Sequence, residues 1–80
     1  MDQTILDRVR NLISNLMRVP LEEVTISSSP STITTWDSLQ HLNLILSLEE
    51  TFGLQFSPEE TIELLNVETI VLLIEEKKGA

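Results

Sequence analysis

Cysteine is absent from this sequence of 80 residues, which excludes disulfide bonds and thiolate metal sites. The only glycines are Gly53 and Gly79, so a glycine-rich loop that binds phosphates cannot form. The longest apolar run, residues 70–74, is too short to span a membrane. The first residues also lack the basic start and apolar segment of a signal peptide. We therefore expect a soluble protein of the cytoplasm that does not insert into membranes.

Positive charge is scarce in the sequence. Five basic residues stand against thirteen acidic ones, which gives a formal net charge of −8. Nucleic-acid phosphates would repel such a chain, so we expect no nucleic acid as a partner. The same charge favours encounters with basic protein surfaces, although an acidic surface that only maintains solubility is an alternative. The length suits one small domain with a thin core, and we expect residues 1–80 to form that domain as a monomer.

Apolar residues recur at steps of three and four near the start of the sequence, which predicts an amphipathic helix over residues 3–18. Asp2 or Thr4 can cap this helix. Pro20 ends it, because the residue before a proline is pushed out of the helical region. A long loop that contains a single helical turn follows, as far as residue 36. The apolar residues expected to pin this loop to the rest of the protein are Leu21, Val24, Ile26 and Ile33.

Asp37 and Gly53 mark the limits of a second helix over residues 38–52. The carboxylate of Asp37 can accept a hydrogen bond from the first turn, and Gln40 can reach back to complete a capping box. Gly53 suits the left-handed position that ends a helix. The apolar face expected for this helix consists of Leu39, Leu42, Ile45, Leu46 and Leu48.

Two further caps predict the remaining helices. Ser57 and Glu60 form a capping box at the start of a short third helix, which runs to about Leu64 with Ile62 facing inward. Asn66 caps a fourth helix, whose expected apolar face consists of Val67, Ile70, Val71 and Ile74. The prediction is an all-α four-helix bundle with three longer helices, one short helix and a long loop between helices one and two.

Ser38 is the first candidate for a functional residue, because it follows the cap of an apolar helix. Its hydroxyl should lie near the surface, beside unpaired N–H groups and the positive end of the helix dipole. An anion attached there would meet a favourable field. The alternative is that Asp37 and Ser38 only begin a helix. Trp36, just before them, should anchor the loop and pack near His41.

A catalytic interpretation of Ser38 is weak. Ser38 and His41 share one helix face, as a nucleophile and a base would. However, no acidic group is placed to orient the imidazole, no oxyanion hole is evident, and His41 is expected on the surface. The acidic pairs at residues 22–23 and 59–60 lack the ligand spacing of a calcium loop. We therefore expect neither catalytic residues nor a dedicated metal site.

The order of these elements resembles the acyl carrier proteins of fatty-acid and polyketide synthesis over nearly the whole sequence. The stretches that match are Val9 to Leu16, Glu22-Glu23-Val24, Asp37-Ser38-Leu39, Leu48-Glu49-Glu50-Thr51-Phe52 and Ser57-Pro58-Glu59-Glu60. The resemblance implies that Ser38 carries 4′-phosphopantetheine, which a phosphopantetheinyl transferase attaches from coenzyme A. Acyl groups would then be carried as thioesters on its thiol, and the protein itself would not be an enzyme.

The resemblance also implies a partner surface along the second helix that meets basic patches on acyl-loading and acyl-processing enzymes. Its expected residues are Asp37, Leu39, Gln40, Asn43, Glu49, Glu50, Glu59, Glu60 and Glu63. Many members of the family have Leu-Gly where this sequence has Thr34-Thr35, and acidic residues where it has Gln40 and Asn43. These departures favour a free-standing carrier of a specialised pathway. A peptidyl or aminoacyl carrier and a small helical adaptor without a prosthetic group are the alternatives.

Overall fold

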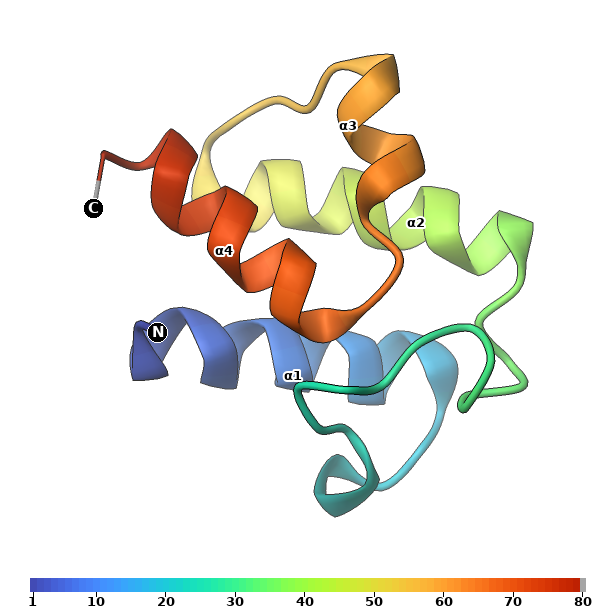
Figure 1. Ribbon diagram of the computed structural model, residues 1–80. Helices are drawn as coiled ribbons and strands as arrows, with labels where there is room; N and C mark the ends of the chain where they lie inside the picture. The colour runs from blue at the N-terminus through green and yellow to red at the C-terminus, as the bar shows by residue number, and fades with distance from the viewer. Residues whose placement is uncertain (80) are drawn as a thin grey trace.

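The architecture is entirely helical in the computed structural model, which describes residues 1–79. The elements in order are α1 (Gln3–Met17), the 3₁₀ turn η1 (Leu21–Glu23), α2 (Ser38–Phe52), α3 (Pro58–Glu63) and α4 (Val67–Lys77). Helices α1 and α2 run antiparallel and α4 packs on α1, while the short α3 lies across the side of α2 (Figure 1). The predicted four-helix architecture is confirmed, with three longer helices and one short one.

The helices begin where short polar side chains accept hydrogen bonds from the first turn. Asp2 accepts the N–H of Thr4 at 2.9 Å, and Asn66 accepts the N–H of Thr69 at 2.7 Å. These bonds satisfy N–H groups that have no partner inside the helix. Gly53 ends α2 with a φ of 65°, as its place in the sequence predicts. Arg18 ends α1 in the same left-handed conformation, with a φ of 58°.

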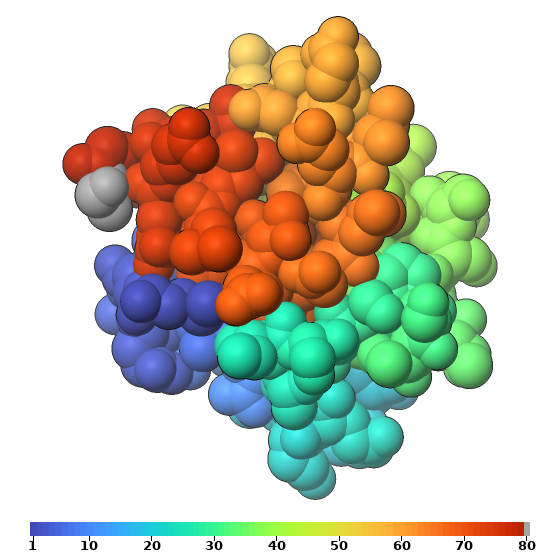
Figure 2. All heavy atoms as spheres, in the orientation of Figure 1, coloured from blue at the N-terminus to red at the C-terminus, as the bar shows by residue number. Residues whose placement is uncertain are grey.

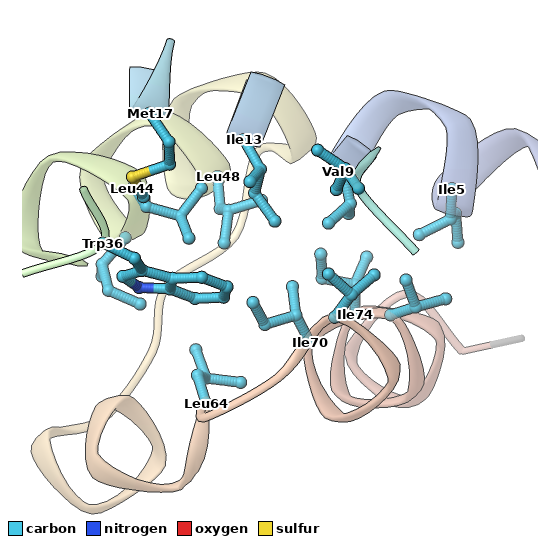
Figure 3. Close-up of a cluster of buried hydrophobic side chains, with 14 of the residues drawn as sticks. Ile5, Val9, Ile13, Met17, Trp36, Leu44, Leu48, Leu64, Ile70 and Ile74 are labelled. Atoms are coloured by element: carbon cyan, nitrogen blue, oxygen red, sulfur yellow. The ribbon is translucent and has the colours of Figure 1, made fainter. Parts of the chain in front are cut away.

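The core lies between α1, α2 and α4 and is completed by residues of the connecting segments (Figure 3). The predicted inner face of α4 is confirmed, because Val67, Ile70, Val71 and Ile74 are all buried. The other buried apolar residues are Ile5, Val9, Ile13, Met17, Val24, Ile33, Trp36, Leu44, Ile45, Leu48, Phe52 and Leu64. Burial of this apolar surface is the main force that holds the bundle together.

The predicted inner face of α2 is wrong for three of its residues. Leu39 is 66% exposed, and Leu42 and Leu46 are each 55% exposed. Ile45 and Leu48 are buried as predicted, and Leu44 and Phe52 complete the inner face of α2. Apolar residues surround most of α2, so their period alone cannot decide which stripe faces inward. On α3, Ile62 is 72% exposed rather than inward, and Leu64, just after the helix, enters the core in its place.

The loop between α1 and α2 is held largely by polar contacts. Arg10 donates to the carbonyl oxygens of Val24 and Leu21, at 2.6 and 2.9 Å, and the Thr35 hydroxyl donates to the carbonyl of Met17 at 2.7 Å. Two apolar residues, Val24 and Ile33, are buried as expected. Leu21 and Ile26, by contrast, are exposed; their carbonyl oxygens, rather than their side chains, hold the loop, by accepting from Arg10 and from the N–H of Glu68.

The same loop also holds the start of α4. The N–H of Val67 donates to the carbonyl of Ser28 at 3.1 Å, and the N–H of Glu68 donates to the carbonyl of Ile26 at 3.0 Å. These bonds satisfy further N–H groups at the helix start. The position of α4 therefore depends on a loop about forty residues earlier in the sequence.

Both ends of the described chain lie at the same end of the bundle. The N–H of Asp2 donates to the carboxylate of Glu75, which joins the start of α1 to the last turns of α4. The start of α2 lies at the opposite end (Figure 1). Among residues 1–79, no helix is long and apolar enough to cross a membrane.

Glu60 joins the start of α3 to the end of α4. Its carboxylate accepts the N–H of Ser57 at 2.8 Å and pairs with the ammonium group of Lys77 at 2.9 Å, while the Ser57 hydroxyl accepts the N–H of Glu60 at 3.2 Å. The predicted capping box is therefore confirmed. The hydrogen bond from Lys77, followed by the one from the Ser57 backbone, lowers the pKa of Glu60 below its usual value of 4.5.

The substitution Glu60→Gln should lower the melting temperature at neutral pH. Glutamine retains the acceptor of the capping box but loses the charge that pairs with Lys77. Because the folded-state pKa of Glu60 is lowered, its ionised form stabilises the protein above the unfolded value of 4.5, and this contribution disappears as the pH falls through the folded-state pKa. Melting curves of wild type and variant should therefore converge in acid. Glu59→Gln is the control, since Glu59 has no ionic partner within residues 1–79. A gap that is independent of pH would contradict this account.

Candidate functional site

Ser38 is the first residue of α2 and is exposed. Asp37 precedes it in an extended conformation, and its carboxylate accepts the N–H of Gln40 at 2.9 Å. The carbonyl of Asp37 accepts the N–H of His41 at 2.8 Å and so begins the helix. No acceptor within residues 1–79 takes up the N–H groups of Ser38 and Leu39. The expected position of the hydroxyl, exposed on the first turn beside unpaired N–H groups, is confirmed.

Gln40 does not complete the predicted capping box. Its side-chain oxygen accepts a hydrogen bond from the amide of Asn43 at 3.2 Å, and the N–H of Asp37 donates to the carbonyl of Thr35 at 3.0 Å. The tight turn before α2 therefore satisfies the group that Gln40 was expected to reach. Gln40 and Asn43 instead form a neutral, hydrogen-bonded pair one turn apart on the surface of α2.

Trp36 is buried directly before this site. Its side chain is only 3% exposed, and its indole is directed into the core, among Leu48, Leu64 and Ile70 (Figure 3). The indole N–H donates to Nδ1 of His41 at 3.1 Å. The two rings also stack, with centroids 6.2 Å apart and planes inclined by 25°. The expected contact with His41 and the expected anchoring role are both confirmed.

His41 is half-buried, which corrects the expectation that it lies on the surface. Because an indole N–H can only donate, Nδ1 of His41 accepts, and Nε2 carries the hydrogen. Nε2 lies 3.0 Å from the carbonyl oxygen of Thr61, to which it therefore donates. We call these linked contacts the Trp36–His41–Thr61 bridge. Both imidazole nitrogens are engaged in it, so neither serves as a base for Ser38 in this arrangement.

A surface hollow of about 430 Å³ adjoins Ser38. Its lining residues are Pro30, Trp36, Asp37, Ser38, His41 and Leu65. In Figure 2 the segment between α3 and α4 (orange) lies beside the loop that leads to α2 (green), and both segments contribute residues to the hollow. Sequence reasoning missed Pro30 and Leu65, since only the tertiary fold brings them to Ser38. The only feature of the sequence that pointed to the hollow was the short spacing between Trp36 and His41, two of its lining residues.

The expected partner surface is spread along α2 and α3. Asp37 and Leu39 lie next to Ser38, the neutral pair follows, and Glu50 is exposed near the far end of α2. Glu49 is partly engaged, because its carboxylate accepts the N–H of Phe56 at 2.9 Å. On α3, Glu59 and Glu63 are exposed, whereas Glu60 pairs with Lys77. Within residues 1–79, no three His, Asp or Glu side chains gather closely enough to hold a metal ion.

Comparison with known proteins identifies the family. An acyl carrier protein of Coprothermobacter proteolyticus is 32% identical over 73 residues, which cover 91% of this chain and 89% of that protein. The chain belongs to the acyl carrier protein family. An acyl carrier protein of Thermosynechococcus vestitus is also 32% identical, over 95% of this chain and 94% of its own. Acyl carrier protein 3 of Ralstonia nicotianae is 26% identical over 90% of this chain and 83% of its own. No family model matches the chain.

Membership in the acyl carrier protein family gives the chain a carrier role, as the resemblance implied. A carrier needs an exposed attachment point on a rigid element more than it needs a catalytic group. At the start of α2, Asp37 caps the helix and Trp36 anchors the chain just before it, while Ser38 is exposed.

The substitution Asp37→Ala should destabilise the protein by about 0.5–2 kcal/mol, because α2 loses its N-cap acceptor. Asp37→Asn is the matched control, since asparagine removes the same charge and keeps a side-chain oxygen in place. Urea unfolding, followed by circular dichroism, measures both. Equal stability of Asp37→Ala and wild type would show that the contact with Gln40 contributes nothing.

Proposed function

We propose that this carrier holds acyl groups as thioesters on 4′-phosphopantetheine, attached to the hydroxyl oxygen of Ser38. The observation that carries the proposal is the position of Ser38 in a member of the acyl carrier protein family. It is exposed at the start of a capped helix of fifteen residues. The prosthetic group supplies a flexible arm with a terminal thiol, which a chain without cysteine cannot supply itself.

The residues around Ser38 fit this group. Its phosphodiester would carry negative charge beside the unpaired N–H groups of Ser38 and Leu39, at the positive end of the α2 dipole. The Asp37 carboxylate is turned toward the N–H of Gln40, so it offers no base to the Ser38 hydroxyl. Activation of that hydroxyl, together with the magnesium ion, then belongs to the phosphopantetheinyl transferase.

The same proposal includes the setting of the carrier. Residues 1–80 form one carrier domain, monomeric and cytoplasmic, that serves trans-acting enzymes. The continuous core shared by α1, α2 and α4 supports a single domain. The neutral pair Gln40–Asn43 supports a specialised pathway rather than housekeeping fatty-acid synthesis. Peptidyl or aminoacyl carriers share the same arm, and the loading enzyme would distinguish them.

Partner enzymes are proposed to dock along α2 and α3. Exposed leucines at positions 39, 42 and 46 form a stripe on α2, with Asp37 before it and Glu50 after it. Basic patches on partner enzymes can pair with these acidic ends, with Glu49 and with the acids of α3 at residues 59, 60 and 63. In the middle, Gln40 and Asn43 offer amides, which cannot replace a charge-assisted bond to Arg or Lys.

The attachment site is tested by intact-mass measurement after incubation with coenzyme A, magnesium and a transferase of broad specificity. Wild type should gain the mass of one phosphopantetheine, and Ser38→Ala should gain none while keeping its helical circular dichroism spectrum. Ser47→Ala, on the same helix, is the matched control and should be labelled. His41→Ala should also be labelled, because the base belongs to the transferase.

Each outcome of the mass measurement has a defined meaning. Labelling that persists in Ser38→Ala would move the attachment to another residue. A wild type that gains no mass would favour a helical adaptor without a prosthetic group.

The neutral pair should limit turnover by enzymes of fatty-acid elongation. The double variant Gln40→Glu/Asn43→Asp should improve kcat/KM with such an enzyme, by roughly 0.2–1 kcal/mol for each exposed pair gained. The control Gln55→Glu/Asn15→Asp adds the same charge at exposed positions outside α2 and should improve it less. Efficient elongation by the wild type, or equal gains in both double variants, would contradict the role given to Gln40 and Asn43.

A further inference from the structure

The position of the acyl cargo follows from what surrounds Ser38, if Ser38 carries the arm as proposed above. An apolar chain attached there will leave water for the nearest apolar surface. Two places compete for it: the bundle interior beneath the start of α2, and the outer hollow that Ser38 itself lines. The side chains on each route decide between them.

The inward route is closed by the Trp36–His41–Thr61 bridge. The indole of Trp36 occupies the space between α2 and the segment that follows α3, toward Leu64 and Ile70 (Figure 3). A chain that passed there would displace a side chain that is only 3% exposed. It would also break the hydrogen bonds from Trp36 to His41 and from His41 to Thr61, of 3.1 and 3.0 Å. Each broken bond would leave a polar group without its partner in a partly dry site.

The outward route needs no rearrangement. The hollow of about 430 Å³ begins at Ser38 and is already open, and its size falls within the range of small-molecule sites, about 300–1,000 Å³. Pro30 and Leu65 form apolar walls, and Leu65 is 58% exposed. Covering Leu65 would therefore remove apolar surface from water on both the protein and the cargo.

We propose that the pantetheine arm and the first carbons of its acyl group lie in this outer hollow, against Pro30 and Leu65, while the Trp36–His41–Thr61 bridge keeps the acyl chain out of the core. The carrier thus displays its cargo on the outside of the bundle. A partner enzyme can take the acyl chain from this position without opening the helices.

The probe for this proposal is the octanoyl-phosphopantetheine form, made from octanoyl-coenzyme A with the transferase. Intact mass first shows that Ser38 is loaded, and a failure at this step counts against the proposed function alone. Nuclear Overhauser contacts are then measured between the octanoyl chain and the protein methyl groups. Contacts to Leu65 are expected, together with methyl shifts of Leu48 and Ile70 that do not change from the unacylated form. Octanoyl contacts to Leu48 or Ile70 in the wild type would overturn the proposal.

Two leucines provide the matched comparison. Leu65→Ala should lose the octanoyl contacts at position 65 of the hollow. It should also lose the change in chemical shift that acylation causes at the neighbouring indole N–H of Trp36. Leu72→Ala removes an equally apolar side chain that is 49% exposed on α4 and does not line the hollow, and it should retain both signals. Identical behaviour of the two variants would show that Leu65 holds no cargo.

The bridge is tested separately with Trp36→Phe, which keeps an aromatic ring but loses the N–H that donates to His41. In this variant, octanoyl contacts to Leu48 or Ile70 should appear. If Trp36→Phe folds and its octanoyl chain still contacts only Leu65, the bridge is not what keeps the acyl chain out of the core. The comparison of Leu65→Ala with Leu72→Ala stands even if Trp36→Phe fails to fold.

Discussion

The burial of one tryptophan organises the end of the molecule that carries Ser38. A buried indole N–H without an acceptor costs about 1–3 kcal/mol, so Trp36 requires a partner inside the protein. His41, on the first turns of α2, accepts this hydrogen bond at Nδ1, and its Nε2–H donates a hydrogen bond to the carbonyl of Thr61 on α3. The end of the loop, the first turns of α2 and α3 are thereby held in one arrangement. Trp36 and His41 therefore hold the start of α2 on its inner side, while Ser38 remains exposed to solvent.

The helix boundaries could be predicted from the sequence because local chemistry determines them. Asp2, Asp37, Ser57 and Asn66 each accept hydrogen bonds from their own first turn, and Gly53 adopts the conformation that glycine favours. Which face of a helix enters the core depends on its neighbours. On α2, leucines and isoleucines surround most of the helix. Packing against α1 and α4 determines that Leu44 is buried and Leu42 exposed, and the sequence pattern of α2 alone does not contain this information.

The candidate site was likewise predictable only where it depends on residues that are neighbours in the sequence. Ser38 follows directly from the cap and from the family resemblance, because both depend on neighbouring residues. The hollow does not, since Pro30 and Leu65 meet only after the loop has bonded to the start of α4 through Ser28 and Ile26. The prediction that His41 lies on the surface was wrong for a related reason. Its acceptor, the carbonyl of Thr61, is a backbone atom that any residue would provide. Such contacts leave no trace in residue identity.

The hydrogen bond between the N–H of Asp2 and Glu75 has a practical consequence. It places the beginning of α1 beside the end of α4, at the opposite end of the bundle from Ser38 (Figure 1). A purification tag, a fluorescent fusion or a surface anchor joined beside these two helix ends would project away from Ser38. Immobilised in this way, the molecule would present Ser38 and its hollow to the solution. A short peptide that joined the start of α1 to the end of α4 would not cross the face that contains Ser38.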